Sequence, residues 1–326
     1  MLTAFLHEGE HAWRIDAAPS AEALGQALWI DLLLATADET AQVRAATGLD
    51  IPDEAAINEI ESSSRLSTRN DVLYINMPII SMTDGPRGVA VGFVLSADRL
   101  ITIRFAASRS FESYTEQLRR GETMQESSSH VFVALMEAII DRQADALEAI
   151  RADLEKISNR IFRLGATGAG GRRDEDRRLR ATLSELGTIG DLISHIRDTQ
   201  VAAARIVPYV ETVAAEWLPK DIRARLRTLR RDIASVSDFS THLNDKLQFM
   251  LDATLGFISI AQNNLMKVMT IASVAGIPPV LIAGIYGMNF RAMPELDWTW
   301  GYAWGLGLIA VSTIIPLLVF RWRKWI

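Results

Sequence analysis

The chain has 326 residues, with 34 Lys and Arg against 40 Asp and Glu, and carries a formal net charge of -6 at pH 7. This acidic balance gives no electrostatic support to a nucleic-acid partner, and none is expected. The sequence has no cysteine, which excludes disulfides and thiolate metal sites. Its first residues lack a basic segment followed by a long apolar stretch, so no signal peptide is expected.

Residues 1–110 are predicted to form a mixed α/β domain. Short apolar stretches indicate strands, and two segments between them indicate helices. Val89–Leu95 is expected to pair with Leu100–Phe105 across a turn at residues 96–99. The other predicted strands are Leu2–Leu6, Leu28–Leu34 and Val72–Ile80, and the predicted helices are Ala21–Ala27 and Asp38–Thr47.

This domain shows no catalytic constellation. His7 and His11 lie four residues apart, but on a predicted strand and loop rather than on one helix, so surface histidines are favoured over a metal-binding pair. The sequence contains nothing that resembles a catalytic triad, a helical histidine pair or a nucleotide-binding loop. We therefore expect no enzymatic activity and no cofactor.

Residues 111–218 are predicted to be mainly helical, with a break near Gly121 and Ser127. Within Met136–Leu164, apolar residues follow a 3-4 spacing that predicts a long helix packed on another helix. One position of this series, near Gln143 or Ala144, is filled by small or polar residues.

A further helix is expected over about Asp174–Ile206. It should end at Pro208, because proline lacks an amide hydrogen and clashes with the preceding turn. Residues 219–286 are then predicted to form a final helix with an apolar stripe over Ile222–Ile258. This helix would have on the order of 65 residues, or ~100 Å at 1.5 Å per residue, and would continue from the cytoplasm into a membrane.

Two uncharged apolar runs, Val268–Ile285 and Ala303–Phe320, stand near the C-terminus. Each has about 18 residues, near the minimum for a helix that spans a hydrocarbon core of roughly 30 Å. A polar loop over 287–302 connects them, and a basic tail over 321–326 follows. The two prolines inside the first run would need packing against other helices to be tolerated.

Positive charge lies on the side of the two spans away from the loop. The loop has only Arg291, whereas the basic residues before the first span and after the second are Lys246, Lys267, Arg321, Arg323 and Lys324. By the positive-inside rule, both termini are expected in the cytoplasm and the loop outside. Aromatic residues stand at the predicted interfaces, as in an aromatic belt: Trp298, Trp300, Tyr302, Trp322 and Trp325.

The sequence Tyr-Gly-Met-Asn-Phe ends the first span at 286–290, and Met-Pro-Glu-Leu follows at 293–296. With two C-terminal spans and a basic tail, these motifs resemble the CorA family of divalent metal-ion (magnesium) transport proteins, whose signature is Gly-Met-Asn. The resemblance implies an α+β chain with an N-terminal cytoplasmic α/β domain, a long helical stalk with coiled-coil-like helices and two transmembrane helices. It also implies a homopentameric funnel in the inner (plasma) membrane.

A helix turns ~100° per residue, which places polar, small and apolar side chains together on one face of the first span. Around a symmetry axis this face would line a pore. Its members are Asn263, Met266, Met269, Ser273, Ile277, Val280 and Gly284, with Asp252 below them at the predicted mouth. Met266, Met269 and Ile277 are candidates for a hydrophobic constriction that gates by excluding water, and Asp252 is a candidate regulatory metal ligand.

The resemblance implies that Gly287, Met288 and Asn289 form the selectivity filter. A ring of neutral amide oxygens can hold hydrated magnesium without stripping its water, yet weakly enough to release it. The local sequence also allows a helix C-cap, with Gly287 ending the helix and Asn289 bonding the turn. Glu295 and Asp297 would form either a ring of negative charge at the external entrance or a solvated loop.

The expected function is passive, voltage-driven uptake of Mg²⁺ through a central pore with metal-regulated gating. Expected partners are divalent metal ions, the lipid bilayer and further copies of the chain. One alternative is a zinc, cobalt or nickel transporter on the same scaffold. Another, of a different class, is a membrane-tethered sensor or scaffold, but an anchor gains nothing from the polar face of the first span.

Overall fold

The structure is a computed structural model that describes residues 1–8, 12–59, 65–81, 87–121, 126–167, 172–288, 293–294, 297–323 and 325. It divides into two compact units. The first unit comprises Met1–Phe162 and Thr182–Leu251, and the second comprises Arg163–Ala181 and Asp252–Ile326.

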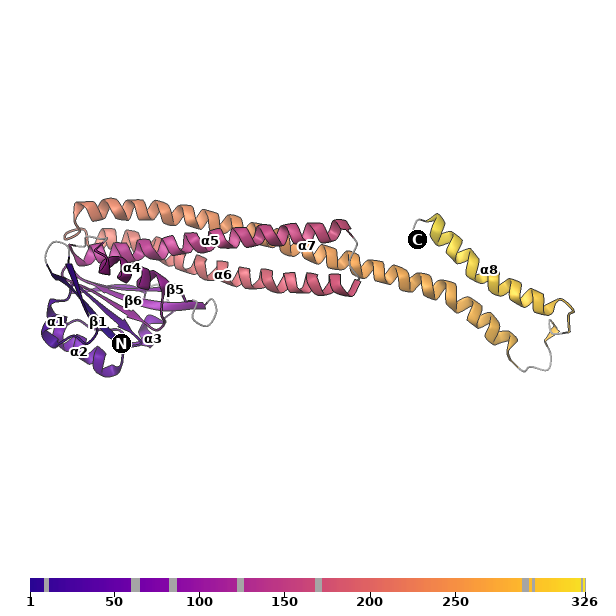
Figure 1. Ribbon diagram of the computed structural model, residues 1–326, viewed down its shortest axis with the longest axis horizontal. Coiled ribbons are helices and arrows are strands. Elements are labelled where there is room, and N and C mark those ends of the chain that lie inside the picture. The colour runs from indigo at the N-terminus through magenta and orange to yellow at the C-terminus, as the bar shows by residue number, and fades with distance from the viewer. Residues whose placement is uncertain are drawn as a thin grey trace. The chain divides into compact units, whose positions relative to one another are not determined.

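A seven-stranded sheet forms the base of the first unit, in the order β2-β1-β3-β7-β6-β5-β4 (Figure 1). The strands are β1 (Leu2–Glu8), β2 (Ala12–Asp16), β3 (Trp29–Leu33), β4 (Leu66–Arg69), β5 (Val72–Ser81), β6 (Arg87–Leu95) and β7 (Leu100–Arg104). β3 and β7 pair in parallel, and the other neighbours are antiparallel. The expected β6–β7 hairpin is confirmed, with Leu95 opposite Leu100.

Short helices cover one face of the sheet and long helices cover the other (Figure 1). The short ones are α1 (Ala21–Gln26), α2 (Ala37–Thr47) and α3 (Glu54–Ile57). Leu24 of α1 and Val43 of α2 share a buried cluster with the sheet. On the other face, Phe132, Ile206 and Leu226 of three long helices join a second cluster. The predicted mixed α/β fold of this region is therefore confirmed.

The helices that follow the sheet are α4 (Arg109–Arg119), α5 (Ser128–Thr167), α6 (Arg172–Val213) and α7 (Lys220–Tyr286). The break between α4 and α5 lies where Gly121 and Ser127 predict it, and Gly121 has a positive φ of 66°. The apolar series of α5 is buried at Leu147, Leu154 and Ile161. This burial is the packing that its 3-4 spacing predicts.

The expectation that Pro208 ends a helix is wrong. α6 continues through Pro208 to Val213. The proline removes one backbone hydrogen bond, but neighbouring Val207 and Val210 are fully buried in the core. Thr212 also donates its hydroxyl to the Pro208 carbonyl over 2.8 Å. Burial of apolar residues on both sides of the proline outweighs the local cost, because tertiary packing overrides intrinsic propensity.

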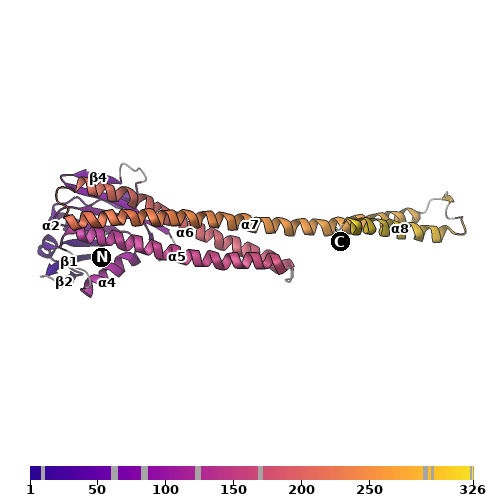
Figure 2. The ribbon, with the colours of Figure 1, turned by 90° about the horizontal axis from the view of Figure 1, so that it is seen from above.

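In the second unit, the last part of α7 leads to a connection and then to α8 (Gly301–Trp322). α7 is a single helix of 67 residues, close to the expected length, and it can be followed along its course in Figures 1 and 2. Pro278 and Pro279 lie inside α7, and Pro316 lies inside α8. Each helix contains an 18-residue window apolar enough to cross a membrane, with none of the window buried. The predicted long helix and two apolar C-terminal helices are confirmed.

Candidate ion pathway

The predicted pore residues all lie on one face of α7 in the second unit. Their angular positions, at ~100° per residue, fall within an arc of roughly 120°. Every one of them is exposed in the single chain: Asn263, Met266, Met269, Ser273, Ile277, Val280 and Gly284. Val280 keeps 70% of its surface accessible and Ile277 keeps 56%. This face, called the open face below, therefore has no covering element among the described residues of the chain.

The opposite face of α7 is partly covered. Its half-buried residues recur every three or four positions: Ile271, Ala275, Pro278, Pro279, Ile282 and Tyr286. α8 shows the same spacing at Gly305, Leu308, Ile309, Ser312, Thr313, Pro316 and Phe320. α8 runs back from the connection, in the direction opposite to the last part of α7 (Figure 1). The open face is thus the side of α7 opposite these half-buried residues.

Two threonine hydroxyls in the spans are satisfied by their own helix. Thr270 donates to the Met266 carbonyl over 2.8 Å, and Thr313 donates to the Ile309 carbonyl over 3.0 Å. Within the described part of the chain, no protein group hydrogen-bonds the side chain of Asn263 or Ser273. A polar side chain without a hydrogen-bond partner costs free energy when it faces lipid tails, but not when it faces water or a hydrated ion.

The predicted filter begins where α7 ends. The amide of Gly287 donates to the Ala283 carbonyl over 3.0 Å, and that of Met288 donates to the Ile285 carbonyl over 3.2 Å. Gly287 is not among the described glycines with positive φ, so it does not form the left-handed cap that the local sequence allows. A Cβ at this position would lie 3.2 Å from the Ala283 carbonyl oxygen, which is a tight contact.

Several predicted residues lie outside the described residues: Asn289, Glu295 and His11. Of the predicted acidic entrance only Asp297 is described, and it is exposed. Asp252 is exposed on α7 as well. The described residues contain no group of three or more His, Cys, Asp or Glu that could hold a metal ion. A regulatory role for Asp252 therefore stays a prediction.

Two pairs of side chains attach the beginning of α7 to α5 in the first unit, and His130 with Asp221 is the first pair. His130 Nε2 lies 2.9 Å from Asp221 Oδ2, and His130 Nδ1 lies 2.8 Å from the Ser127 hydroxyl. Burial alone would raise the pKa of Asp221, but the hydrogen bond and charge of His130 hold that pKa below its ordinary value.

The second attachment lies one turn further along α7. Arg225 donates to both carboxylate oxygens of Glu137, over 3.1 and 2.6 Å. This hydrogen bond raises the pKa of Arg225 against the opposing effect of burial. A bidentate pair of this kind fixes orientation as well as distance, so the helix that carries the pore residues starts from a defined position on α5.

Similarity to known proteins decides the family. A family model described as CorA-like Mg²⁺ transporter protein matches residues 25–323. The chain belongs to this CorA family. It is 31% identical over 329 residues to the magnesium transport protein CorA of Salmonella typhimurium, and equally so to that of Escherichia coli K12, with 100% of each chain covered. The resemblance read from the Gly-Met-Asn and Met-Pro-Glu-Leu motifs is confirmed.

The fold agrees with a solved CorA structure. The complete structure of the CorA magnesium transporter from Methanocaldococcus jannaschii matches with a TM-score of 0.76 at 17% identity, covering 100% of this chain and 99% of that one. This likeness confirms the α+β fold class with its long helix and two C-terminal helices. Since CorA proteins are membrane transporters, the expectation that this chain is not an enzyme is also confirmed.

Sequence reasoning did not find the pocket that lies between α4, α5 and α6. Arg109, Arg142 and Gln143 line it. The one signal available was the polar residue that interrupts the apolar series of α5 at position 143. A polar residue at such a position is also common on a solvated helix face, so burial was needed to distinguish the two.

Proposed function

We propose that this CorA-family protein is a magnesium channel that takes up Mg²⁺ passively across the inner (plasma) membrane. The observation that carries the proposal is the open face of α7, where polar and small residues lie exposed in a span otherwise apolar. The relatives at 31% identity are named magnesium transport proteins, which supports the choice of ion. Five copies around an axis, as the family resemblance implies, would bring five open faces together.

The proposed pore has three parts along α7. Asn263 stands at the cytoplasmic end, Met266, Met269 and Ile277 form the hydrophobic constriction, and Ser273 adds a hydroxyl between them. Val280 and Gly284 continue the wall toward the outer end. A constriction of this kind closes by excluding water, so it needs no charged gate.

The filter is assigned to Gly287, Met288 and Asn289, at the outer end of the pore. Magnesium gives up its water reluctantly, and a neutral amide ring can hold the hydrated ion through hydrogen bonds to its water. Glu295 and Asp297 would raise the local cation concentration outside the filter. The apolar side chains of Ile277 and Val280 offer no ligand that could replace water, which supports passage of Mg²⁺ with its hydration shell.

Both termini are proposed to be cytoplasmic, from the distribution of Lys and Arg around the spans. The membrane potential would then drive uptake. It is worth ~2.3 kcal/mol per elementary charge per 100 mV, so roughly 4.6 kcal/mol for a divalent cation.

Zinc, cobalt and nickel are the alternative substrates on the same scaffold. These ions favour nitrogen or sulfur ligands. The open face has no histidine or cysteine, and its ligand atoms are amide and hydroxyl oxygens together with thioether sulfurs at the constriction. The composition of the face therefore favours a hard, hydrated ion.

Ion flux into liposomes that hold the purified protein tests the proposal. With a magnesium-sensitive dye inside and a negative-inside potential, we expect Mg²⁺ entry that the potential accelerates. Asn289→Ala should assemble normally and lose this selective uptake. Asn264→Ala is the matched control, because Asn264 lies on α7 about 100° away from Asn263 and off the open face.

Other outcomes would change the assignment. Entry of zinc alone, following a pH gradient, would keep the scaffold and replace the substrate. Unchanged Mg²⁺ uptake in Asn289→Ala would remove the filter assignment. No entry of any ion would favour the membrane-tethered sensor.

A further inference from the structure

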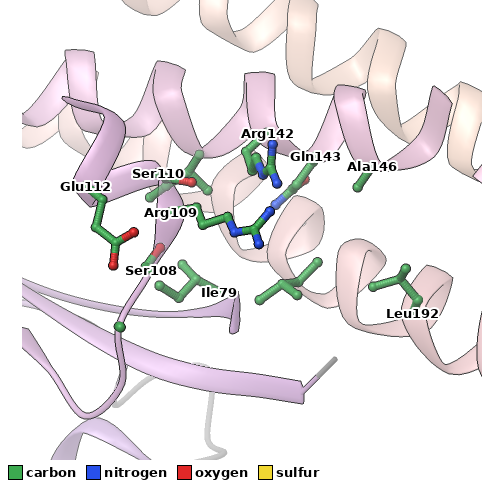
Figure 3. A pocket seen from close by; sticks show the side chains of 12 residues that line it. Ile79, Ser108, Arg109, Ser110, Glu112, Arg142, Gln143, Ala146 and Leu192 are labelled. Atoms are coloured by element: carbon green, nitrogen blue, oxygen red, sulfur yellow. The ribbon is translucent and has the colours of Figure 1, made fainter. Parts of the chain in front are cut away.

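A pocket in the first unit lies far along the sequence from the ion pathway. It has a volume of about 230 Å³ and opens where α4 begins, between the end of β5, α5 and α6 (Figure 3). The lining includes Ile79, Arg109, Ile139, Arg142, Gln143 and Leu192. Nothing in the proposed transport of Mg²⁺ requires this pocket.

Gln143 is the first sign of a ligand. Its side chain is only 4% exposed, and its Oε1 atom has no hydrogen-bond partner among the described residues. A buried carbonyl oxygen without a donor is costly, because it has given up its bonds to water. The position also belongs to the apolar series of α5, where an aliphatic side chain would pack without this cost. A group that donates a hydrogen bond to Gln143 would remove it.

Two guanidinium groups give the pocket positive charge. Arg109 is the first residue of α4, and Arg142 precedes Gln143 on α5. Figure 3 shows Arg109 reaching toward Gln143 across the pocket. Arg142 has a contact with Asp145 at 3.8 Å, but both side chains are exposed and such pairs contribute little. Both arginines are thus available to an anion at the mouth of the pocket.

The beginning of α4 adds to this charge. α4 has 11 residues, and its N-cap residue Ser108 makes no side-chain capping hydrogen bond. The first amides of a helix lack partners within the helix and carry partial positive charge. The acidic residue of the lining, Glu112, lies in Figure 3 at the end of the pocket away from Arg142 and Gln143.

We propose that this pocket binds a small metabolite that carries a phosphate group. Phosphate has close to two negative charges near neutral pH, which matches two guanidinium groups, whereas a single carboxylate would leave one unmatched. Arginine binds phosphate through paired hydrogen bonds, and helix N-termini favour the same group. A hydroxyl on the ligand donates to Gln143 Oε1. Ile79, Ile139 and Leu192 contact the carbon skeleton.

Thermal unfolding of the purified full-length protein tests this site with three probes: inorganic phosphate, glycerol 3-phosphate and adenosine monophosphate. Sodium chloride at matched ionic strength is the reference. We expect at least one probe to raise the unfolding temperature in a saturable manner. Equal binding of all three identifies free phosphate as the ligand, and preference for an ester identifies a phosphorylated metabolite.

Variants connect the binding to the pocket. Arg109→Gln and Arg142→Gln should each weaken binding about tenfold or more, since each removes charge-assisted hydrogen bonds. Gln143→Leu should remove the preference for a hydroxylated ester over inorganic phosphate. Arg119→Gln is the matched control: Arg119 lies at the other end of α4, has a 60% exposed side chain and does not line the pocket. It should bind as the parent protein does.

Two results would overturn the proposal. One is the absence of any shift beyond that of sodium chloride with all three probes. The other is a shift that persists unchanged in both Arg109→Gln and Arg142→Gln. Mg²⁺ flux measured on the same variants is expected to remain, so failure of this site and failure of the transport function are distinguishable.

Discussion

The two units of the chain treat apolar surface in opposite ways. In the first unit, two clusters of large apolar side chains are buried on the two faces of a sheet, and the buried Asp31 is paired with Arg104. In the second unit, large apolar side chains are exposed along α7 and α8, including Val280 at 70% and Leu318 at 59%. The first pattern is typical of a domain in water, and the second is typical of segments that cross a membrane.

The comparison shows why burial cannot identify function in the second unit. Residues exposed on α7 include both those we assign to the pore and those that would face lipid. The two groups differ in the type of side chain and in its angular position around the helix axis. The open face contains amide, hydroxyl and glycine positions. In the first unit burial does help to identify a binding site, because a single buried polar atom without a hydrogen-bond partner points to a ligand there.

The largest effect is expected when a buried charge of the first unit loses its partner. Asp31 accepts hydrogen bonds from the Thr102 hydroxyl over 2.6 Å and from Arg104 Nε over 2.9 Å, and both charged side chains are at most 9% exposed. Asp31→Ala leaves Arg104 buried without its anion. We expect a loss of about 3–5 kcal/mol in the free energy of unfolding, measured with denaturant.

Asp50→Ala serves as the control for that variant. Asp50 lies 3.4 Å from Arg44, and both side chains are more than half exposed. Removing such a surface pair should change stability by about 0–1 kcal/mol. Equal losses in Asp31→Ala and Asp50→Ala would contradict the importance of the buried pair.

A lysine introduced at an exposed apolar position of each unit tests whether the two exposed surfaces face different solvents. Ile314 on α8 is 52% exposed, and Val201 on α6 is 47% exposed. Ile314→Lys should cost roughly 2.5–3.5 kcal/mol of membrane insertion if α8 crosses the bilayer. Val201→Lys faces water and should stay within about 0.5 kcal/mol of the parent. Membrane fractionation measures the first and thermal unfolding the second; normal insertion of Ile314→Lys would argue against a membrane span.

Two glycines of α6 test close packing within the first unit. A Cβ at Gly187 would meet nothing within 4 Å, whereas one at Gly190 would lie 3.2 Å from Leu247 of α7. Gly187→Ala should stabilise the helix by roughly 0.5–1 kcal/mol. Gly190→Ala should gain less or destabilise, because Leu247 must move. The unfolding temperatures of the two variants decide this, and equal gains would contradict the tight contact.

The smallest expected effect depends on pH. Burial, followed by the charges of Glu137, Asp145 and Asp232, raises the pKa of Asp141 above its ordinary value of 3.8. The stability that protonated Asp141 provides is present below 3.8 and is lost as pH rises through the raised pKa. Asp141→Asn should therefore gain a few tenths of a kcal/mol at pH 7 and nothing near pH 3.

Thermal unfolding at the two pH values measures this difference. Asp153→Asn is the control, since Asp153 pairs with Lys156 over 2.8 Å, whereas the charged neighbours that act on Asp141 are acidic. It should show no gain at pH 7. A gain for Asp141→Asn that is the same at both pH values would show that its carboxylate charge is not the cause.

The long helices could be predicted from the sequence because their apolar patterns extend over many residues. The apolar stripe of α7 and the two uncharged runs each depend on a dozen or more positions. Two short strands were not predicted: β4 contributes Leu66–Arg69 at one edge of the sheet, and β2 lies at the other edge, where it pairs with β1. Their stability comes from strand pairing, which the local sequence does not show.

The sequence likewise predicts some features of the candidate sites and not others. Because a helix has 3.6 residues per turn, the sequence places Asn263 and Ser273 on one side of α7, and their role in a pore stays a prediction. The pocket at Gln143 could not be predicted, because it joins a strand end and three helices separated by up to about a hundred positions. Which residues of the last part of α7 are half-buried also required the structure.

Accessibility of single cysteines tests the pore assignment most directly, because the parent sequence contains no cysteine. Ser273→Cys and Ile277→Cys place a thiol on the open face, and Ala275→Cys and Ile282→Cys place one on the opposite, half-buried face. With Mg²⁺ flux as the readout, a small cationic thiol reagent should block the first two variants and leave the second two active. Block of the second pair alone, or equal effects on both faces, would contradict a pore along this side of α7.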